Sequence, residues 1–274
     1  MRYSYDTINN MLTILYIIFA ILGLIIGSFL NVVVLRLHTQ RISKGRSCCG
    51  TCSHTLSTLD LIPVISYVCL LGRCRYCKLK ISKQYPIVEI VTSLAFVGIF
   101  YRVVAISGGD ITTIILYFIY FATIFSLLIS MAVYDIKHFI LPWSLMKIFL
   151  VFTFVGSIVI AFLSNNLSFL NFVSGFIVAL PFWAIWYLSK GRLIGFGDIL
   201  LMIGFGFMLG INGGYSATIF GFWIGALYFV LKMILTRNFI SGKTVVPFGP
   251  FLIAGLYFTF LTGITLTSLV LGMV

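Results

Sequence analysis

The chain has 274 residues, of which 61% are hydrophobic and only 9% are charged. Its mean hydropathy of +1.16 excludes an ordinary water-soluble domain, in which about a quarter of the residues are charged. The net charge of +12 would favour nucleic acid as the partner of a soluble protein, but in a membrane protein basic residues collect in cytoplasmic loops whatever the partner is. We therefore expect a multi-pass membrane protein without a nucleic-acid partner.

Eight apolar stretches follow one another along the chain, most of them close to the roughly 20 residues with which a helix crosses a bilayer. A membrane-spanning barrel would instead need alternating segments of about ten residues. The sequence thus predicts an all-α polytopic fold with about eight transmembrane helices and both termini on one side. The stretches are 11–35, 86–106, 111–134, 144–163, 169–188, 193–211, 215–235 and 248–271.

The order of these stretches divides the chain into three predicted parts. Residues 1–35 form an uncleaved first helix, because no small-residue cleavage site follows Arg2. Residues 36–85 are the one long connection, and residues 86–274 form a seven-helix membrane domain. Of the 18 Lys and Arg residues, only Arg2 and Arg102 fall on the side of the termini. The positive-inside rule therefore places the long connection in the cytoplasm and both termini outside.

Four cysteines in the long connection form two Cys-x-x-Cys pairs. Each pair presents two thiolates from one tight turn, and two such turns can close a tetrahedral zinc site. A cytoplasmic location argues against disulfides, and a short loop with few large apolar residues needs such a metal to fold. We expect residues 36–85 to be a small zinc-stapled domain with Cys49, Cys52, Cys74 and Cys77 as ligands.

Other interpretations of the cysteine region stay open from the residues alone. Cys48 could replace Cys49 by a one-residue slip, and His54 is a weak alternative ligand. Cys69 lies in an apolar run and is expected to be a buried thiol. The pairs could also be redox-active, which would make the chain a membrane thiol oxidoreductase.

Two aspartates lie at the predicted cytoplasmic ends of membrane stretches, where ionisable residues are functional candidates by default. Asp135 ends the third stretch, and Asp198 lies near the start of the sixth within Gly195-Phe196-Gly197-Asp198. If that stretch begins near Leu193, Asp198 lies about 7 Å below the membrane surface. Irregular backbone around the glycines would be tolerated there only beside a protein cavity or water.

Two carboxylates that share a partly dry cavity cannot both ionise easily. One then activates water while the other protonates the scissile amide, which is the chemistry of aspartic proteolysis and needs no metal. The structural alternatives are a helix cap at Asp198 and an interfacial ion pair between Asp135 and Lys137. Small-residue pairs elsewhere, Gly206 with Gly210 and Gly221 with Gly225, are expected to mediate close helix packing.

Several short motifs follow one another along the chain. They are Gly27-Ser28-Phe29-Leu30-Asn31-Val32-Val33 with Arg36, the two cysteine pairs, Asp60-Leu61-Ile62-Pro63, Tyr85-Pro86-Ile87-Val88-Glu89, Asp135 with Ile140-Leu141-Pro142, Gly195-Phe196-Gly197-Asp198, and Pro247-Phe248-Gly249-Pro250. In this order, and along almost the whole chain, they resemble the motifs of the type IV prepilin peptidase family. One departure is Cys48-Cys49-Gly50, where members of that family often have proline after the first zinc cysteine; the thiol positions are unaffected.

This resemblance implies an intramembrane aspartic protease with Asp135 and Asp198 as its catalytic pair. It implies cleavage of a basic leader, after a glycine, from type IV prepilin or pseudopilin precursors at the cytoplasmic face of the bacterial inner membrane. Many bacterial members also methylate the new N-terminus with S-adenosylmethionine, an activity that accompanies the cysteine-bearing loop. Since no glycine-rich nucleotide fingerprint is visible, methylation rests on the resemblance alone, and a peptidase without it is the alternative.

Two other acidic residues of these motifs, Glu89 and Asp60, have both a structural and a functional interpretation. Glu89 is either a helix-start charge beside Lys83 or a contact to cofactor or substrate, and Asp60 either begins a turn or binds cofactor. The residues expected to shape the substrate site are Gly195, Gly197, Pro247, Gly249 and Pro250.

A proton-coupled transporter remains a competing class, because membrane aspartates also serve as proton relays. It lacks the paired broken helices or internal repeat expected of such proteins.

Overall fold

The computed structural model describes residues 2–37, 47–236 and 246–272, with side chains from Met11 onward. These residues are helical, apart from loops and two isolated β-bridges, Cys48 with Thr55 and Arg73 with Lys80. The chain forms two compact units, Met1–Ser130 and Met131–Val274. The predicted all-α class is confirmed.

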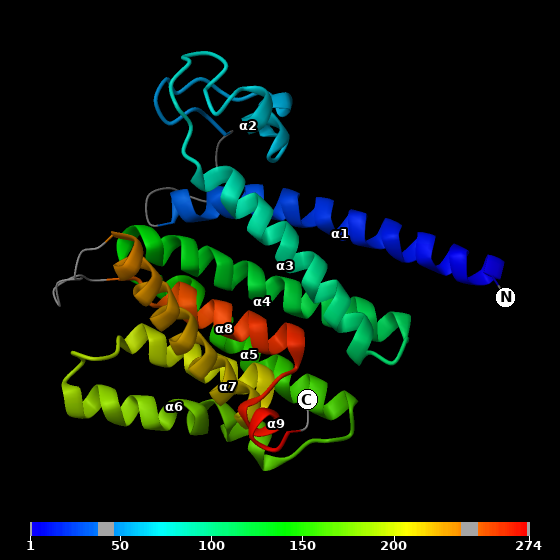
Figure 1. Ribbon diagram of the computed structural model, residues 1–274, viewed down its shortest axis with the longest axis vertical. Coiled ribbons are helices and arrows are strands. Elements are labelled where there is room, and N and C mark those ends of the chain that lie inside the picture. The colour runs from blue at the N-terminus through cyan, green and yellow to red at the C-terminus, as the bar shows by residue number, and fades with distance from the viewer. Residues whose placement is uncertain (1, 38–46, 237–245, 273–274) are drawn as a thin grey trace. The chain divides into compact units, whose positions relative to one another are not determined.

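The first unit contains a helix pair with the cysteine region between its members. Helices α1 (Arg2–Arg36) and α3 (Gln84–Ile106) pack side by side (Figure 1). They approach closely at Gly23, where a Cβ atom would lie 2.6 Å from the Cα of Ser93. The connection carries the 3₁₀ helix η1 (Thr58–Leu61) and the short helix α2 (Ile65–Cys69). Helix α4 (Ile111–His138) begins in this unit and ends in the second.

The second unit is organised around α7 (Phe196–Thr236), against which α5 (Trp143–Leu163), α6 (Phe169–Ser189) and α8 (Gly249–Thr262) pack. A short helix, α9 (Leu266–Val270), also contacts α7. The contacts are glycine-rich, so that backbones meet with little side chain between them. Gly206 of α7 lies against Gly175 of α6, and Gly221 of α7 lies against Gly255 of α8. Such small-residue contacts are typical of helix packing in membranes.

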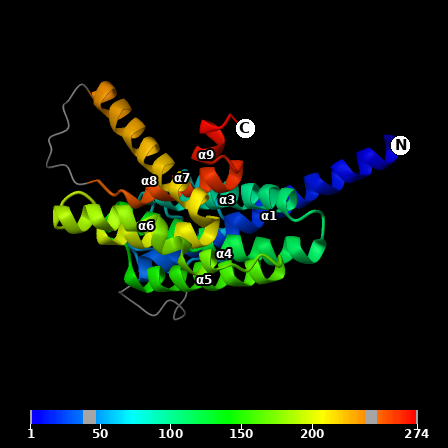
Figure 2. The ribbon, with the colours of Figure 1, turned by 90° about the horizontal axis from the view of Figure 1, so that it is seen from below.

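Helix α7 is not straight, because it turns sharply at Gly210 (Figure 2). Gly210 has φ 72° and ψ −176°, which no L-residue adopts without strain. A Cβ atom on Gly214 would lie 2.8 Å from the Cα of Gly206, although these residues would be about 12 Å apart on a straight helix. The expected packing role of Gly210 is therefore wrong: this glycine makes the turn between two helical arms.

Six helices among the described residues are long and apolar enough to cross a membrane: α1, α3, α4, α5, α6 and α7. The predicted stretches 193–211 and 215–235 are the two arms of α7, so one helix contains both. The last predicted stretch, 248–271, is interrupted because Gly263 ends α8 in the left-handed region at φ 71°. Helix α8 is then only about 21 Å long, shorter than the roughly 30 Å hydrocarbon core.

Candidate functional site

The four paired cysteines meet in the first unit, with their sulfur atoms all within 4.8 Å of one another. The Sγ atoms of Cys49 and Cys77 are 3.9 Å apart. Four sulfurs arranged tetrahedrally at about 2.3 Å from a zinc ion would be about 3.8 Å apart. The cluster therefore fits a tetrahedral thiolate site. Neither Cys48 nor His54 belongs to this cluster within the described residues.

The two cysteine turns have the same backbone pattern. In each turn the fifth residue from the first cysteine makes a main-chain pair with it, as in Cys49 N–H to the His54 carbonyl and Cys74 N–H to the Leu79 carbonyl, both 2.9 Å. In each turn the residue after the second cysteine also has positive φ, 55° at Ser53 and 60° at Lys78. Two equivalent turns thus present two thiols each, as the spacing predicts.

Two thiols of the cluster, Cys49 and Cys77, have pKa values shifted in opposite directions. Hydrogen bonds from the backbone N–H groups of Cys52 and Thr51 lower the pKa of Cys49 to about 6. At Cys77 a backbone bond with Leu79 acts to lower the pKa, but burial and the neighbouring thiols outweigh it and raise the pKa to about 11. A divalent cation would allow all the thiolates to coexist, because metal binding releases the protons of its ligands.

Asp60 holds the second cysteine turn. Its carboxylate accepts the Nε–H of Arg75 at 2.7 Å and the hydroxyl of Tyr76 at 3.2 Å, and these are the two residues between Cys74 and Cys77. Ser57 donates both its N–H and its hydroxyl to the same carboxylate. Burial acts to raise the pKa of Asp60, but these hydrogen bonds outweigh it and hold the pKa at about 2. The side chain is only 3% exposed, since its partners cover it.

The ring of His54, in the first cysteine turn, lies against that of Tyr76 in the second, with ring centroids 3.7 Å apart and the planes tilted by 36°. This contact joins the two cysteine turns. Cys69, expected to be buried, is exposed, because α2 turns that face outward.

Glu89 lies in α3 and is 6% exposed. Its carboxylate accepts the N–H of Val64, at the start of α2, at 2.7 Å, and it is also bonded to the Ser28 side chain of α1. Glu89 therefore joins three elements of the first unit. Its predicted contact to a cofactor, like that of Asp60, stays a prediction.

Asp135 and Asp198 both lie in the second unit, at the end of α4 and in the first turn of α7. Asp135 is 5% exposed and accepts the N–H of Gly249, the first residue of α8, at 3.1 Å. Asp198 is bonded to the backbone of Gly195. Each aspartate is thus positioned by a glycine from one of the motifs quoted above.

The aspartates interact electrostatically with each other. In the described part of the chain neither forms an ion pair, and the hydrogen bonds to their carboxylates come from the backbone. The predicted partnership of Asp135 with Lys137 is not among these contacts. Each carboxylate therefore keeps acceptor sites for water or substrate, which a proton-transferring pair requires.

The glycines of the two motifs leave room for neighbouring groups. A Cβ atom on Gly249 would lie 2.8 Å from the Oδ2 of Asp135, and one on Gly197 would lie 3.0 Å from the Cδ1 of Leu141. Leu141 also reaches Gly249, whose Cβ would lie 3.3 Å from its Cδ2. Leu141 thus packs between the two glycine segments, a role that its place in the Ile140-Leu141-Pro142 motif did not predict.

The prolines lie at the start of α8, as expected, whereas α7 begins slightly later than expected. Pro247 precedes α8, and Pro250 lies in its first turn, where proline starts helices. Helix α7 begins at Phe196, three residues after Leu193, and Leu193 is 75% exposed. The segment containing Gly195 is therefore non-helical.

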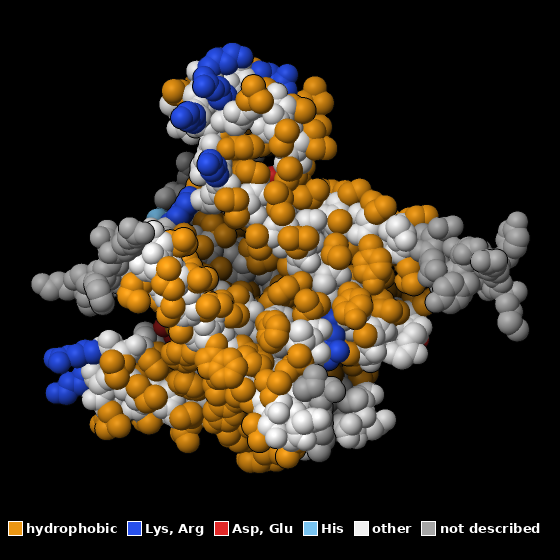
Figure 3. Space-filling model, viewed as in Figure 1, with side chains coloured by type: hydrophobic (Ala, Val, Ile, Leu, Met, Phe, Trp, Pro, Cys, Tyr) orange, Lys and Arg blue, Asp and Glu red, His pale blue; other side chains and the backbone are white. Residues whose placement is uncertain are grey.

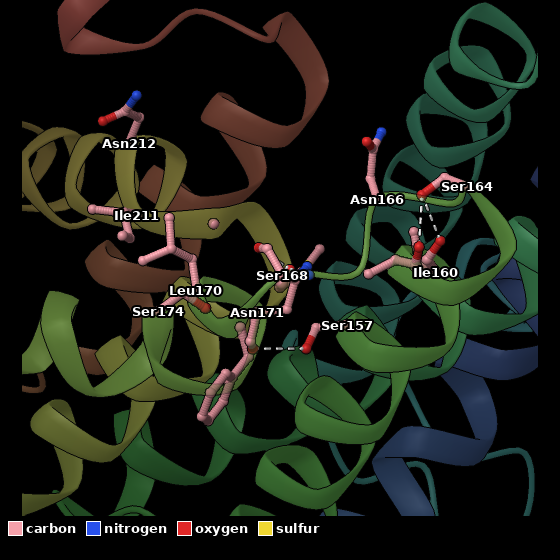
Figure 4. A pocket seen from close by; sticks show the side chains of 14 residues that line it. Ser157, Ile160, Ser164, Asn166, Ser168, Leu170, Asn171, Ser174, Ile211 and Asn212 are labelled. Atoms are coloured by element: carbon pink, nitrogen blue, oxygen red, sulfur yellow. Dashed lines mark hydrogen bonds between the residues drawn. The ribbon is translucent and has the colours of Figure 1, made fainter.

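A separate cavity of about 540 Å³ lies in the second unit beside the α5–α6 turn and Gly210 (Figure 4). Its lining includes Ser157, Asn171 and Asn212 but no acidic or basic side chain. Because proton transfer needs titratable groups, the side chains that line this cavity do not supply general acid–base chemistry.

Two family models match parts of the chain. Residues 21–103 match the family model described as the bacterial peptidase A24 N-terminal domain, and residues 122–230 match the type IV leader peptidase family. No solved structure gives a significant match.

The chain is 32% identical over 266 residues to the prepilin leader peptidase/N-methyltransferase of Bacillus subtilis, covering 96% of this chain and 99% of that protein. It is 29% identical over 271 residues to the protein of the same name from Aeromonas hydrophila, covering 89% and 90%. A third, from Pseudomonas aeruginosa, is 30% identical over 270 residues, covering 86% of each. These matches define the class as membrane-embedded peptidases, and the chain belongs to the type IV leader peptidase family.

Proposed function

We propose that this chain is an intramembrane aspartic endopeptidase that removes the basic leader from type IV prepilin-like precursors. The name shared by these relatives, prepilin leader peptidase/N-methyltransferase, supports this substrate class. The observation that carries the proposal is the pair Asp135 and Asp198, which interact with each other while each is held by a glycine backbone group.

In the proposed reaction, water lies between the two carboxyls. The ionised carboxylate accepts a proton as the water oxygen attacks the carbonyl carbon of the scissile peptide bond. The protonated carboxyl then donates its proton to the leaving amide nitrogen as the carbon–nitrogen bond breaks. A carboxyl pair with one shared proton supplies both roles at neutral pH, as in other aspartic proteases.

We place both aspartates at the cytoplasmic face of the bacterial inner membrane, with residues 36–85 in the cytoplasm and both termini outside. The distribution of Lys and Arg supports this orientation, because only Arg2 and Arg102 fall on the other side. Part of the cysteine region and the loop with Arg237 and Lys243 lie outside the described residues.

We propose zinc for the four-cysteine cluster, on the sulfur spacing given above. The ion would hold the two cysteine turns together and would take no part in peptide hydrolysis. The ligands would be Cys49, Cys52, Cys74 and Cys77.

Methylation of the new N-terminus is the second proposed activity, supported by the name of the relatives, which includes N-methyltransferase. S-adenosylmethionine would supply the methyl group. Both carboxylates suggested for its binding, Glu89 and Asp60, are already hydrogen-bonded within the protein.

The test is co-expression of the chain with a candidate prepilin, followed by mass spectrometry of the pilin N-terminus. Asp135→Asn and Asp198→Asn should each reduce cleavage by more than about a hundredfold, since general acid–base groups contribute at least that much. The matched control is Asp110→Asn, which changes an exposed carboxylate bonded only within its own turn to Thr112 and Thr113. Unimpaired cleavage by either site variant would contradict the proposal. A cleaved pilin without an added methyl group would leave the peptidase and remove the methyltransferase.

A further inference from the structure

The cysteine region presents an apolar surface that its own fold does not cover. Six large apolar side chains within 59–71 are exposed, and Figure 3 shows hydrophobic side chains gathered on one side of this region. The most exposed are Leu71 at 85%, Val68 at 61% and Leu59 at 61%. We name this surface the apolar patch; its members are Leu59, Leu61, Ile62, Ile65, Val68 and Leu71.

The patch is tied to a membrane helix at a definite level. Val64, in the middle of the patch sequence, donates its N–H to Glu89 of α3 at 2.7 Å. Glu89 lies five residues after Gln84, the first residue of α3, which corresponds to about 7.5 Å along the helix axis. Helix α2 therefore lies beside the first turns of a helix long and apolar enough to span a membrane. Interfacial helices bury their apolar face about 5–10 Å into the headgroup and acyl boundary.

The charge around the patch also suits a bilayer surface. Residues 47–83 contain five basic residues and one acidic residue, Asp60, which is already paired with Arg75. A four-thiolate zinc centre with a formal charge of about −2 would leave this region positive. Arg73 lies two residues after Leu71 and is exposed. Basic residues at this level attract anionic lipid headgroups.

We propose that the apolar patch inserts into the cytoplasmic leaflet, with anionic lipid around it. The occupant of the patch is then the bilayer surface, and the cysteine domain lies on the membrane instead of projecting freely from it. This inference concerns the first unit alone and does not depend on the peptidase or methyltransferase proposals.

The experiment uses the full chain in lipid nanodiscs that contain phosphatidylglycerol and phosphatidylcholine. Val68 or Leu71 is replaced by the photoreactive residue benzoylphenylalanine, and adducts are identified by mass spectrometry after irradiation. The matched negative control places the same residue at Thr51, which is exposed in the first cysteine turn. The positive control is Val151, which is 60% exposed in α5. Retained metal by elemental analysis shows that the domain is folded in each variant.

We expect lipid adducts at positions 68, 71 and 151 and no lipid adducts at position 51. If positions 68 and 71 behave like position 51 in folded protein, the proposal is overturned. Crosslinks from these positions to another protein segment or to a co-reconstituted prepilin, without lipid adducts, would overturn it as well.

A second arm tests the charge. Arg73→Gln should reduce the preference for phosphatidylglycerol over phosphatidylcholine in the adducts at position 71 about fivefold, the effect expected of one basic residue at an anionic surface. High salt should weaken the preference of the parent protein in the same direction. Equal adduct yields from both lipids in the parent protein would overturn the anionic part of the proposal.

Discussion

Asp60 of the first unit and the two aspartates of the second unit differ in what binds their carboxylates. Asp60 receives hydrogen bonds from three side chains, including a charged one. Among the described residues, Asp135 and Asp198 are each bonded to the backbone of one glycine. A carboxylate saturated by side chains is held in one charge state and organises structure, whereas one with remaining acceptor sites can exchange protons with water or substrate. The same residue type therefore divides into structural and candidate catalytic roles by its partners.

We expect the strongest effect from a substitution in the cysteine cluster of the first unit. Cys74→Ser removes the buried member of the cysteine cluster, so we expect loss of the metal and unfolding of the cysteine region. Structural zinc contributes about 10–16 kcal/mol to the folding of small domains. Metal content and limited proteolysis between residues 47 and 83 measure the effect.

The matched control for the cluster is Cys69→Ser, at an exposed cysteine outside the cluster. It should retain one metal ion per chain and the protease resistance of the parent. Full metal content in Cys74→Ser would show that the cluster is not a four-ligand site.

The next prediction concerns Gly249, which contacts the candidate catalytic residue Asp135. A Cβ atom on Gly249 would lie 2.8 Å from the Oδ2 of Asp135, so Gly249→Ala must displace the carboxylate from its backbone partner. We expect prepilin cleavage to fall about a hundredfold, because a 1 Å misplacement of a reacting group can cost this much. The cost in stability should be only about 1–3 kcal/mol, the usual effect of overpacking.

Gly225→Ala is the control for Gly249→Ala, because the atoms nearest to its added methyl group belong to the side chains of Phe248, at 3.2 Å, and Phe251. Cleavage by this variant should stay close to that of the parent. If both variants lose cleavage in proportion to their loss of melting temperature, the contact with Asp135 has no special role.

A smaller effect tests the residue that packs between the glycine motifs. A Cβ atom on Gly197 would lie 3.0 Å from the end of the flexible Leu141 side chain, so Gly197→Ala should reduce cleavage roughly tenfold at most. Leu141→Ala makes room for the added methyl group, and the double variant should recover part of the activity. A coupling of at least about 0.5 kcal/mol between the two substitutions is expected for residues in contact. Additive effects would show that Leu141 does not carry the strain.

Patterns with short range predicted much of the molecule. The Cys-x-x-Cys spacing selected the four clustered residues because each pair is set by one turn, and apolar runs located the helices because a bilayer imposes their length. The aspartates were selected because carboxylates are costly in membranes. Their catalytic role remains a proposal.

Features that depend on three-dimensional contact could not be predicted in the same way. Gly210 looked like a packing residue, since sequence does not distinguish a glycine that admits a neighbouring helix from one that needs positive φ. The bond of Glu89 to Val64 joins residues 25 positions apart, and the position of Leu141 between two glycines depends on the packing of α7 against α8. No periodicity encodes such contacts.

We expect the weakest effect from a substitution of Asp60, which tests its structural role. Asp60→Asn removes the ion pair with Arg75 and weakens the bonds to Ser57 and Tyr76. We expect the cysteine region to lose about 1 kcal/mol of stability, since Arg75 is partly exposed and screened by water. Hydrogen exchange of residues 57–77 in the metal-loaded protein measures this loss.

The pH dependence of that loss follows from the lowered pKa of Asp60, about 2. The contribution of an acid with a lowered pKa is complete above its unfolded value of about 4 and disappears as the pH falls through the folded value. The difference between parent and Asp60→Asn should therefore be constant from about pH 8 to about pH 5. Asp110→Asn, at an exposed turn, should leave exchange of residues 57–77 unchanged at every pH. A difference that shrinks between pH 8 and 5 would mean that Asp60 titrates near neutrality, and the contrast between the two groups of carboxylates would then no longer hold.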